Sequence, residues 1–322
     1  MPELPDVTVY VDCLKARVVG AMLAKVRVKS PFLLRTFEPP AEHVEGRRVV
    51  GVERLGKRIV FEFEGRTGDA VNALGGPVLA LHLMIAGRLL WKPPGTKPGG
   101  KIDLASFEFD GGPESGVLLL TEAGTKKRAA MHVFESRAAM MADASVNRGG
   151  VEPMSCSLRE FGEAMRKENR TVKRVLTSPT VFSGIGNAYS DEILHAAKMS
   201  PFKKSGQLDD EEMARLHKAV VTMLAKWTRE LRAEFGLDPE TGAGPGRFPG
   251  VGKITAFRPG FAVHGKFGKP CPVCGTKVQR VVFAENEMNY CPTCQTEGRV
   301  LADRSMSRLL RDEWPKTVEE LE

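Results

Sequence analysis

The sequence contains no run of eighteen apolar residues, and its start is not a charged segment followed by an apolar one. A membrane-spanning helix needs about 20 apolar residues, and a secretory signal needs the second pattern. We therefore expect a soluble, cytoplasmic protein with no membrane partner. The six cysteines among 322 residues could suggest disulfides, but in a reducing compartment the pairing of four of them argues for a metal site instead.

Four of the six cysteines form two Cys-x-x-Cys pairs with sixteen residues between the pairs. They are Cys271, Cys274, Cys291 and Cys294. This spacing predicts one tetrahedral Zn²⁺ site in which all four positions are thiolates, so the zinc would be structural. Four free cysteines or two disulfides fit the spacing and the compartment less well. The lone Cys13 and Cys156 are expected to be small buried side chains.

Acidic residues are outnumbered by basic ones. The net charge is +7 and the sequence pI is about 9.1, which favours a polyanionic partner, nucleic acid first. A length of 322 residues allows two domains and a sizeable core.

From about residue 20 to residue 136 the sequence shows the alternation and short apolar runs that are typical of strands. Strands are expected within 24–29, 48–64, 78–90, 102–109, 116–121 and 128–134. Clusters of glycine and proline separate several of them. With a helix over 5–18 in front, this region predicts a β-sandwich or barrel that carries an N-terminal helix.

After residue 136 the pattern becomes helical. Ser157 and Glu160 match a capping box ahead of an apolar face. Further helices are expected over 171–176, 188–197 and 209–235, followed by a mobile or irregular loop over 236–260. The sequence therefore predicts an α+β protein of several domains.

The first six residues, Met1-Pro2-Glu3-Leu4-Pro5-Asp6, are the ones around which we organise the functional interpretation. Removal of Met1, which the small Pro2 favours, would leave Pro2 as a free secondary amine. An α-amino group titrates near ~7.7–8.0, so a fraction is nucleophilic at neutral pH and can form an iminium with a sugar carbon. Glu3, one residue away, suits proton transfer. A plain helix start explains the same residues about as well.

Three other groups of polar residues have a binding interpretation and a plainer one. Gly184-Ile185-Gly186-Asn187 is a glycine-rich helix entry, whose N–H groups and Asn187 amide would suit a phosphate. Lys57 at a turn and Lys126-Lys127-Arg128 in a loop are either phosphate clamps or solvated surface charges. His82 lies inside an apolar run and fits a core or turn histidine better than a ligand.

Over most of its length the chain resembles the Fpg/Nei superfamily of bifunctional DNA glycosylases. It looks more like the formamidopyrimidine branch than the endonuclease VIII branch, because it begins PELP and not PEGP. The motifs that carry the resemblance are Pro2-Glu3-Leu4-Pro5, Gly56-Lys57-Arg58, the segment 82–87, the segment 184–192, and Val263-His264-Gly265-Lys266 before the cysteine pairs. They occur in the family's order.

The resemblance implies an N-terminal β-sandwich with a leading helix, a helix–two-turn–helix domain and a zinc finger. We expect these parts at 1–136, 137–260 and 261–296, with a C-terminal extension over 297–322. It also implies a monomer, associated with the nucleoid, that flips a damaged base out of DNA. Its N-terminal proline would then displace the base and cut the strand by β,δ-elimination.

The resemblance also assigns residues. Pro2 would be the nucleophile and Glu3 the acid/base, while Lys57 and Asn187 would hold phosphates beside the lesion. Ile85 aligns with a family methionine that fills the hole left by the flipped base. Further DNA contacts would come from His82, Lys126, Lys127 and Arg128.

The chain departs from the family pattern where the family reads DNA. The family segment His-Leu-Gly-Met-Ser-Gly is here His82-Leu83-Met84-Ile85-Ala86-Gly87, so Met84 replaces a glycine. The family's Asp-Pro-Arg-Arg-Phe loop is absent, and residues 121–128 stand in its place, so the wedge lacks its aromatic ring. The family's zinc-finger arginine is here Asn286, between two glutamates that should repel a phosphate.

Two hypotheses follow from the sequence. The first is an active glycosylase and abasic-site lyase whose lesion preference is shifted away from 8-oxoguanine. The second is a protein that keeps the fold and binds damaged DNA without removing a common lesion. The intact Pro2, Glu3 and Lys57 favour the first, whereas the altered wedge and the acidic finger favour the second.

Overall fold

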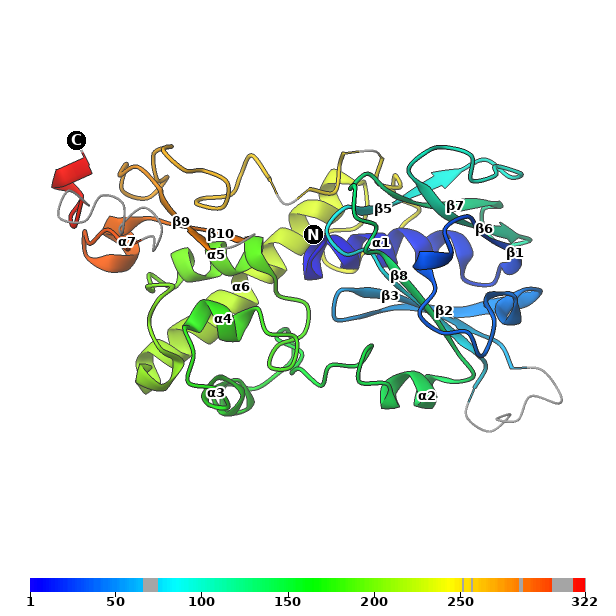
Figure 1. Cartoon of the computed structure of the whole chain (residues 1–322), viewed down its shortest axis with the longest axis horizontal. Helices are drawn as coiled ribbons and strands as arrows, with labels where there is room; N and C mark the ends of the chain where they lie inside the picture. The colour runs from blue at the N-terminus through cyan, green and yellow to red at the C-terminus, as the bar shows by residue number, and fades with distance from the viewer. Residues whose placement is uncertain (66–74, 251, 256, 284–285, 303–314, 322) are drawn as a thin grey trace. The chain divides into compact units, whose positions relative to one another are not determined.

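The computed structural model describes residues 1–65, 75–250, 252–255, 257–283, 286–302 and 315–321. The chain forms two compact units, drawn in Figure 1. The first unit comprises Met1–Arg148 and Lys226–Thr255, and the second comprises Gly149–Ala225 and Ala256–Glu322. Among the residues described, none of the helices combines the length and apolar character needed to span a bilayer.

Antiparallel strands make up most of the first unit, in the order β5-β7-β6-β1-β2-β3-β4-β8. Their bounds are β1 Met22–Val28, β2 Arg47–Leu55, β3 Arg58–Phe63, β4 Val78–His82, β5 Gly87–Lys92, β6 Asp103–Asp110, β7 Gly116–Glu122 and β8 Ala130–Phe134. Only Met22 and Leu23 of β1 pair with β2, so the strands divide there into two halves. Phe61 of β3 stacks on Phe109 of β6 with ring centroids 6.0 Å apart, which places the core between the halves. This is the predicted β-sandwich.

The predicted single strand over 78–90 is wrong, because the apolar run folds back on itself. It forms β4 and β5, joined by a turn over residues 83–86. Met84 has a φ of 52°, in the left-handed region that a helix or strand cannot use. A side chain at Gly87 would lie 2.2 Å from the carbonyl oxygen of Leu83, so only glycine fits there. An apolar run alone does not reveal such a reversal.

The leading helix α1, Leu4–Val18, is confirmed and is almost wholly buried. Glu3 is its N-cap, and the Glu3 backbone N–H donates a hydrogen bond of 2.9 Å to the Asp6 carboxylate. Tyr10 and Leu14 belong to the main core with residues of both halves of the sandwich. In Figure 1 the helix, in dark blue, runs alongside the strands. The chain start is therefore fixed by a helix that the core holds in place.

The segment that follows the long helix α6, Asp210–Glu234, has no helix or strand among its described residues up to 255, as predicted. It is nevertheless attached to the first unit by specific contacts. The buried Arg17 of α1 donates to the carbonyl oxygens of Pro245 and Gly246 at 2.7 and 2.9 Å. The ring of Phe248 lies 5.8 Å from that of Tyr10, and Ile254 belongs to the main core.

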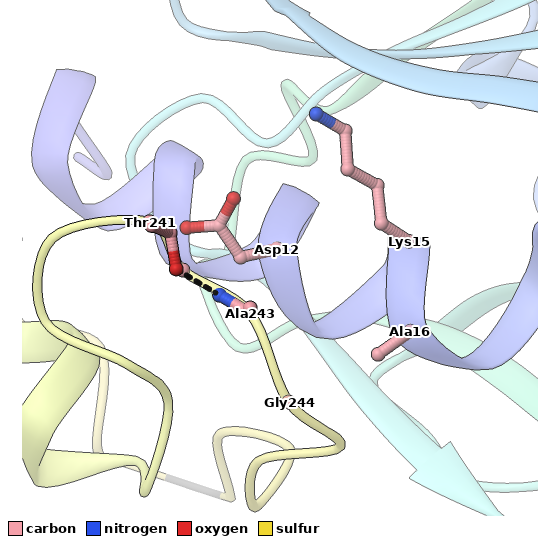
Figure 2. Close-up of a pocket in the computed structure, with 7 residues that line it drawn as sticks. Asp12, Lys15, Ala16, Thr241, Ala243 and Gly244 are labelled. Atoms are coloured by element: carbon pink, nitrogen blue, oxygen red, sulfur yellow. Dashed lines mark hydrogen bonds between the residues drawn. The ribbon is translucent and has the colours of Figure 1, made fainter.

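An open pocket of about 330 Å³ lies where this segment crosses α1. Figure 2 shows the Asp12 side chain pointing toward Thr241, whereas Lys15, further along α1, points away from the loop of Thr241 and Ala243. Asp12 is paired with Arg232 at 2.9 Å, and burial raises the pKa of this carboxyl while the arginine lowers it. None of the residues that line the pocket belongs to the predicted DNA site.

The second unit is helical and ends in a small hairpin. Its elements are α3 Leu158–Arg166, α4 Val172–Leu176, α5 Asn187–Ala196, the first part of α6, β9 Gln279–Phe283, β10 Asn286–Tyr290 and α7 Pro292–Thr296. The predicted capping box is confirmed: the Ser157 N–H donates to Glu160 at 2.8 Å, and the Glu160 N–H donates to Ser157 at 3.2 Å. A short helix α2, Arg137–Ala142, belongs to the first unit.

Candidate active site and zinc site

The chain start is enclosed by charged side chains. Pro2 and Glu3 are buried, and only 2% of Glu3 is exposed. Burial lowers the pKa of the Met1 amine; Glu3 and Asp6 act against this shift, whereas Arg88 and Lys57 add to it. An amine with a lowered pKa is more often unprotonated at neutral pH, which is the form that attacks carbon. The lowered pKa belongs to Met1, whose removal the prediction requires, so it describes the surroundings of the chain start and not the Pro2 nitrogen itself.

Lys57 comes to this end of the chain from a tight hairpin. Leu55 and Arg58 close the pair of strands β2 and β3, and Gly56 has a φ of 60°, as in a type II′ turn. Lys57 as a whole is half-buried. Burial of its amine lowers the pKa of Lys57, whereas nearby Glu3 raises it. The structure thus brings Lys57 close to Glu3, and so to the chain start, although the two residues are far apart in the sequence.

His82 ends β4, where it pairs with Arg58 of β3. It is half-buried, and burial together with Arg58, Lys57 and His132 lowers its pKa to about 3. A neutral imidazole beside three other basic groups is consistent with a structural position and also with a hydrogen-bonding contact to DNA.

Because the pKa of His82 is about 3 in the fold and 6.5 ordinarily, the unfolded chain binds more protons between these values. The stability contributed by the neutral ring is complete above pH 6.5 and is lost as the pH falls toward 3. We expect the free energy of unfolding in urea to fall on acidification by up to about 1.4 kcal/mol per pH unit from this residue. The His82→Gln protein should show a shallower pH dependence; parallel curves would contradict the assignment.

Ile85 lies at the tip of the turn between β4 and β5, and 53% of it is exposed. An exposed isoleucine at the tip of a tight turn has the form of an apolar wedge, of the kind that proteins insert between bases. The left-handed Met84 immediately before it sets the direction of the turn.

The basic loop over 126–128 is shaped by a buried carboxylate. Glu122, 1% exposed, accepts hydrogen bonds from the backbone N–H groups of Arg128 and Ala129, at 2.9 and 3.1 Å to one oxygen. The Lys127 amine donates to the Glu122 carbonyl, whereas Lys126 is exposed. Of these three cations, Lys126 is thus the one most open to a phosphate.

Asn187 is the first residue of α5 in the second unit, after the glycine turn that was predicted. Its side-chain amide donates a hydrogen bond of 2.9 Å to the carbonyl oxygen of Glu287 in β10. The amide has two N–H groups, so one remains to serve as the predicted phosphate contact. Glu285 lies outside the described residues, and the side chain of Asn286 is not described either.

Sequence analysis did not predict a buried ionic network that supports this helix. Lys173 pairs with Asp191 and also donates to the Asn187 carbonyl at 3.1 Å. Asp191 in turn lies 2.7 Å from His264 Nδ1. These partners are separated by 18 and 73 residues, so no local periodicity links them. The Asp191-Glu192 pair in the glycine-turn motif was the available signal.

Glu192 supports the segment that leads into the cysteine pairs. Its carboxylate accepts the backbone N–H groups of Ala262, Val263 and His264 at 2.7, 2.9 and 2.9 Å. Three hydrogen bonds to one buried carboxylate fix the backbone of this segment relative to α5.

The four paired cysteines converge as predicted, with their sulfur atoms all within 4.8 Å of one another. The Cys271–Cys294 sulfurs are 3.9 Å apart and the Cys274–Cys291 sulfurs 3.4 Å. Tetrahedral zinc, with Zn–S distances of about 2.3 Å, requires sulfurs about 3.8 Å apart, so the set fits. The four cysteines form a site for one structural zinc ion. His195 Nε2 lies 3.3 Å from Cys271 Sγ, where an N–H would support the thiolate.

Three family models match the chain. They describe a formamidopyrimidine-DNA glycosylase N-terminal domain over residues 1–122, its H2TH domain over 150–231, and a zinc finger found in FPG and IleRS over 268–296. Their order and position agree with the sandwich, the helices and the cysteine site.

Two proteins of similar sequence point to the same family. The chain is 30% identical to formamidopyrimidine-DNA glycosylase of Thermus thermophilus, over 92% of this chain and 100% of that one. It is 40% identical to an uncharacterized formamidopyrimidine-DNA glycosylase-like protein of Mycobacterium tuberculosis, over 50% of this chain and 94% of that one.

Solved structures also match. The Lactococcus lactis Fpg bound to DNA with an oxidized pyrimidine has a TM-score of 0.73 at 25% identity, covering 92% of this chain and 100% of that one. A complex of the same enzyme with abasic-site DNA gives the same score and identity, over 91% and 99%. On the sequence matches, the fold and the zinc site together, the chain belongs to the formamidopyrimidine-DNA glycosylase family, within the Fpg/Nei superfamily.

Proposed function

We propose that this protein is a DNA repair glycosylase with abasic-site lyase activity. The observation that carries the proposal is the meeting of Pro2, Glu3 and Lys57 at a buried chain start. The family membership and the complexes of L. lactis Fpg with damaged DNA support DNA as the partner. A monomer associated with the nucleoid remains our prediction.

In the proposed reaction, removal of Met1 frees the Pro2 nitrogen. This nitrogen attacks C1′ of a flipped nucleotide, the bond from C1′ to the base breaks, and an iminium forms. Glu3 supplies the proton that opens the sugar ring and then shuttles protons during elimination. Lys57 holds the phosphate beside the lesion and Asn187 a neighbouring one, while His82, Lys126, Lys127 and Arg128 make further contacts to the DNA.

The test is a panel of oligonucleotides that carry different lesions, each scored for base release and for strand nicking. We expect release and nicking together on at least one lesion, with the preference shifted from 8-oxoguanine toward abasic sites, oxidised pyrimidines, or flexible or single-stranded DNA. If every lesion is bound but none is released or nicked, the alternative holds: a damage-binding protein that keeps the fold.

The wedge can be tested separately with Ile85→Ala. Ile85 is 53% exposed, so its truncation should change stability by no more than about 0.5 kcal/mol. It should slow base release from duplex DNA, where a flipped base leaves a hole, but not from single strands. Val50→Ala is a matched control, because Val50 is also 53% exposed. An equal loss in the rate of base release on duplex and single-stranded DNA would contradict the assignment of Ile85 as a wedge.

The replacement of the family's zinc-finger arginine by Asn286 gives a further prediction. Asn286→Arg should tighten DNA binding and steepen the dependence of affinity on salt by about one phosphate contact. The measurement is the slope of log affinity against log salt concentration. A slope equal to that of the wild-type protein would show that this position does not face the phosphate backbone.

A further inference from the structure

Arg88 of β5 holds together two segments that lie 166 residues apart. Its Nε donates to the carbonyl oxygen of Ile254 at 2.8 Å. Its Nη1 donates to the carbonyl oxygens of Ile85 and Gly87 at 3.1 and 2.7 Å. The turn between β4 and β5, residues 83–86, is here called the wedge turn. One half-buried guanidinium therefore connects the backbone of this wedge turn to the segment that follows α6.

Both ends of this connection are otherwise restrained. Ile254 is 1% exposed and belongs to the main core of the first unit. Gly87 begins β5 and cannot carry a side chain, because the Leu83 carbonyl is too close. Ile85, by contrast, projects from the turn and has half its surface exposed. The hydrogen bond from Arg88 thus holds the exposed residue of the turn against a fixed support.

The geometry requires arginine and not merely a positive charge. The guanidinium is a planar group whose five N–H donors point in fixed directions, and two of its nitrogens are used here on opposite partners. Lysine presents one compact ammonium and cannot span the two sides in the same way.

We infer that Arg88 is a positioning residue that couples the wedge turn over 83–86 to the segment ending at Ile254. This inference rests on the proposed function. Two substitutions test the coupling: Arg88→Lys keeps the charge and removes the planar guanidinium, while Arg88→Gln removes both. Arg27→Gln is the control, since Arg27 is a half-buried strand arginine paired with Glu108 at 2.6 Å.

The readout needs no catalysis. A duplex with a tetrahydrofuran abasic analogue opposite 2-aminopurine reports wedge insertion by the fluorescence of the opposite base. We expect both Arg88 variants to lose most of the fluorescence change at saturating protein, while Arg27→Gln keeps it. A full change in Arg88→Lys and Arg88→Gln would overturn the coupling, whether or not the protein proves to be a glycosylase.

Thermal unfolding of each variant checks that the fold is kept. The proposed function has its own test: if the wild-type protein is not trapped by borohydride on abasic DNA, the proposed function fails, and the fluorescence readout still decides the coupling.

Discussion

Replacing Glu3 with glutamine is expected to slow base release by about 10²–10⁴-fold, the usual contribution of a positioned acid or base. Glutamine has the shape of glutamate but cannot carry a proton between atoms of the sugar. Glu3 is buried at the N-cap of α1, and its backbone N–H is held by Asp6, so the backbone there should not move. The measurement is the single-turnover rate of base release from the best substrate of the lesion panel.

The same variant should lose much less on preformed abasic DNA. An abasic sugar already exposes an aldehyde in part of its population, so the amine can attack without a proton donor to open the ring. Glu42→Gln, an exposed glutamate outside the site, is the control and should behave as wild type. Equal rates of base release for Glu3→Gln and wild type would remove Glu3 from the mechanism.

Removing zinc is the change with the largest expected effect on stability. Structural zinc contributes about 10–16 kcal/mol of binding free energy in zinc-finger peptides at pH 7. The small core beside the site consists of Val263, Cys271, Val278 and Cys291, so two of its four members are themselves metal ligands. Such a core cannot fold the hairpin β9–β10 alone.

We therefore expect a strong chelator to expose residues 268–296 to rapid amide hydrogen exchange and to weaken DNA binding. Metal analysis should find one zinc per chain. Cys274→Ser should reproduce the effect of the chelator, whereas Cys156→Ser, which alters a lone half-buried cysteine, should not. Protected amides over 268–296 after complete loss of zinc would contradict a structural role.

The features that could be predicted from the sequence are those that depend on residues close together in the chain. Local patterns were sufficient for α1, for the capping box at Ser157 and for the four cysteines, because each involves a few neighbouring residues. The turn between β4 and β5 was missed because Met84 adopts a left-handed conformation that its residue type does not announce.

Long-range polar contacts were not predictable either. The contact between Arg88 and Ile254 spans 166 residues, and that between Asp191 and His264 spans 73. Neither contact produces a periodic pattern in the sequence, because its two partners are too far apart in the chain. The irregular segment after α6 is held by Phe248 and Ile254, which a glycine- and proline-rich sequence does not reveal.

The most direct test of the account is borohydride trapping on abasic DNA, followed by mass spectrometry of the N-terminal peptide. We predict a covalent product in which the reduced sugar is attached to the nitrogen of Pro2, in chains that have lost Met1. Chains that keep Met1, and the Pro2→Gly variant, should give little or no such product. An adduct on a lysine side chain, or none on any abasic substrate, would contradict a chemistry that begins at the chain start.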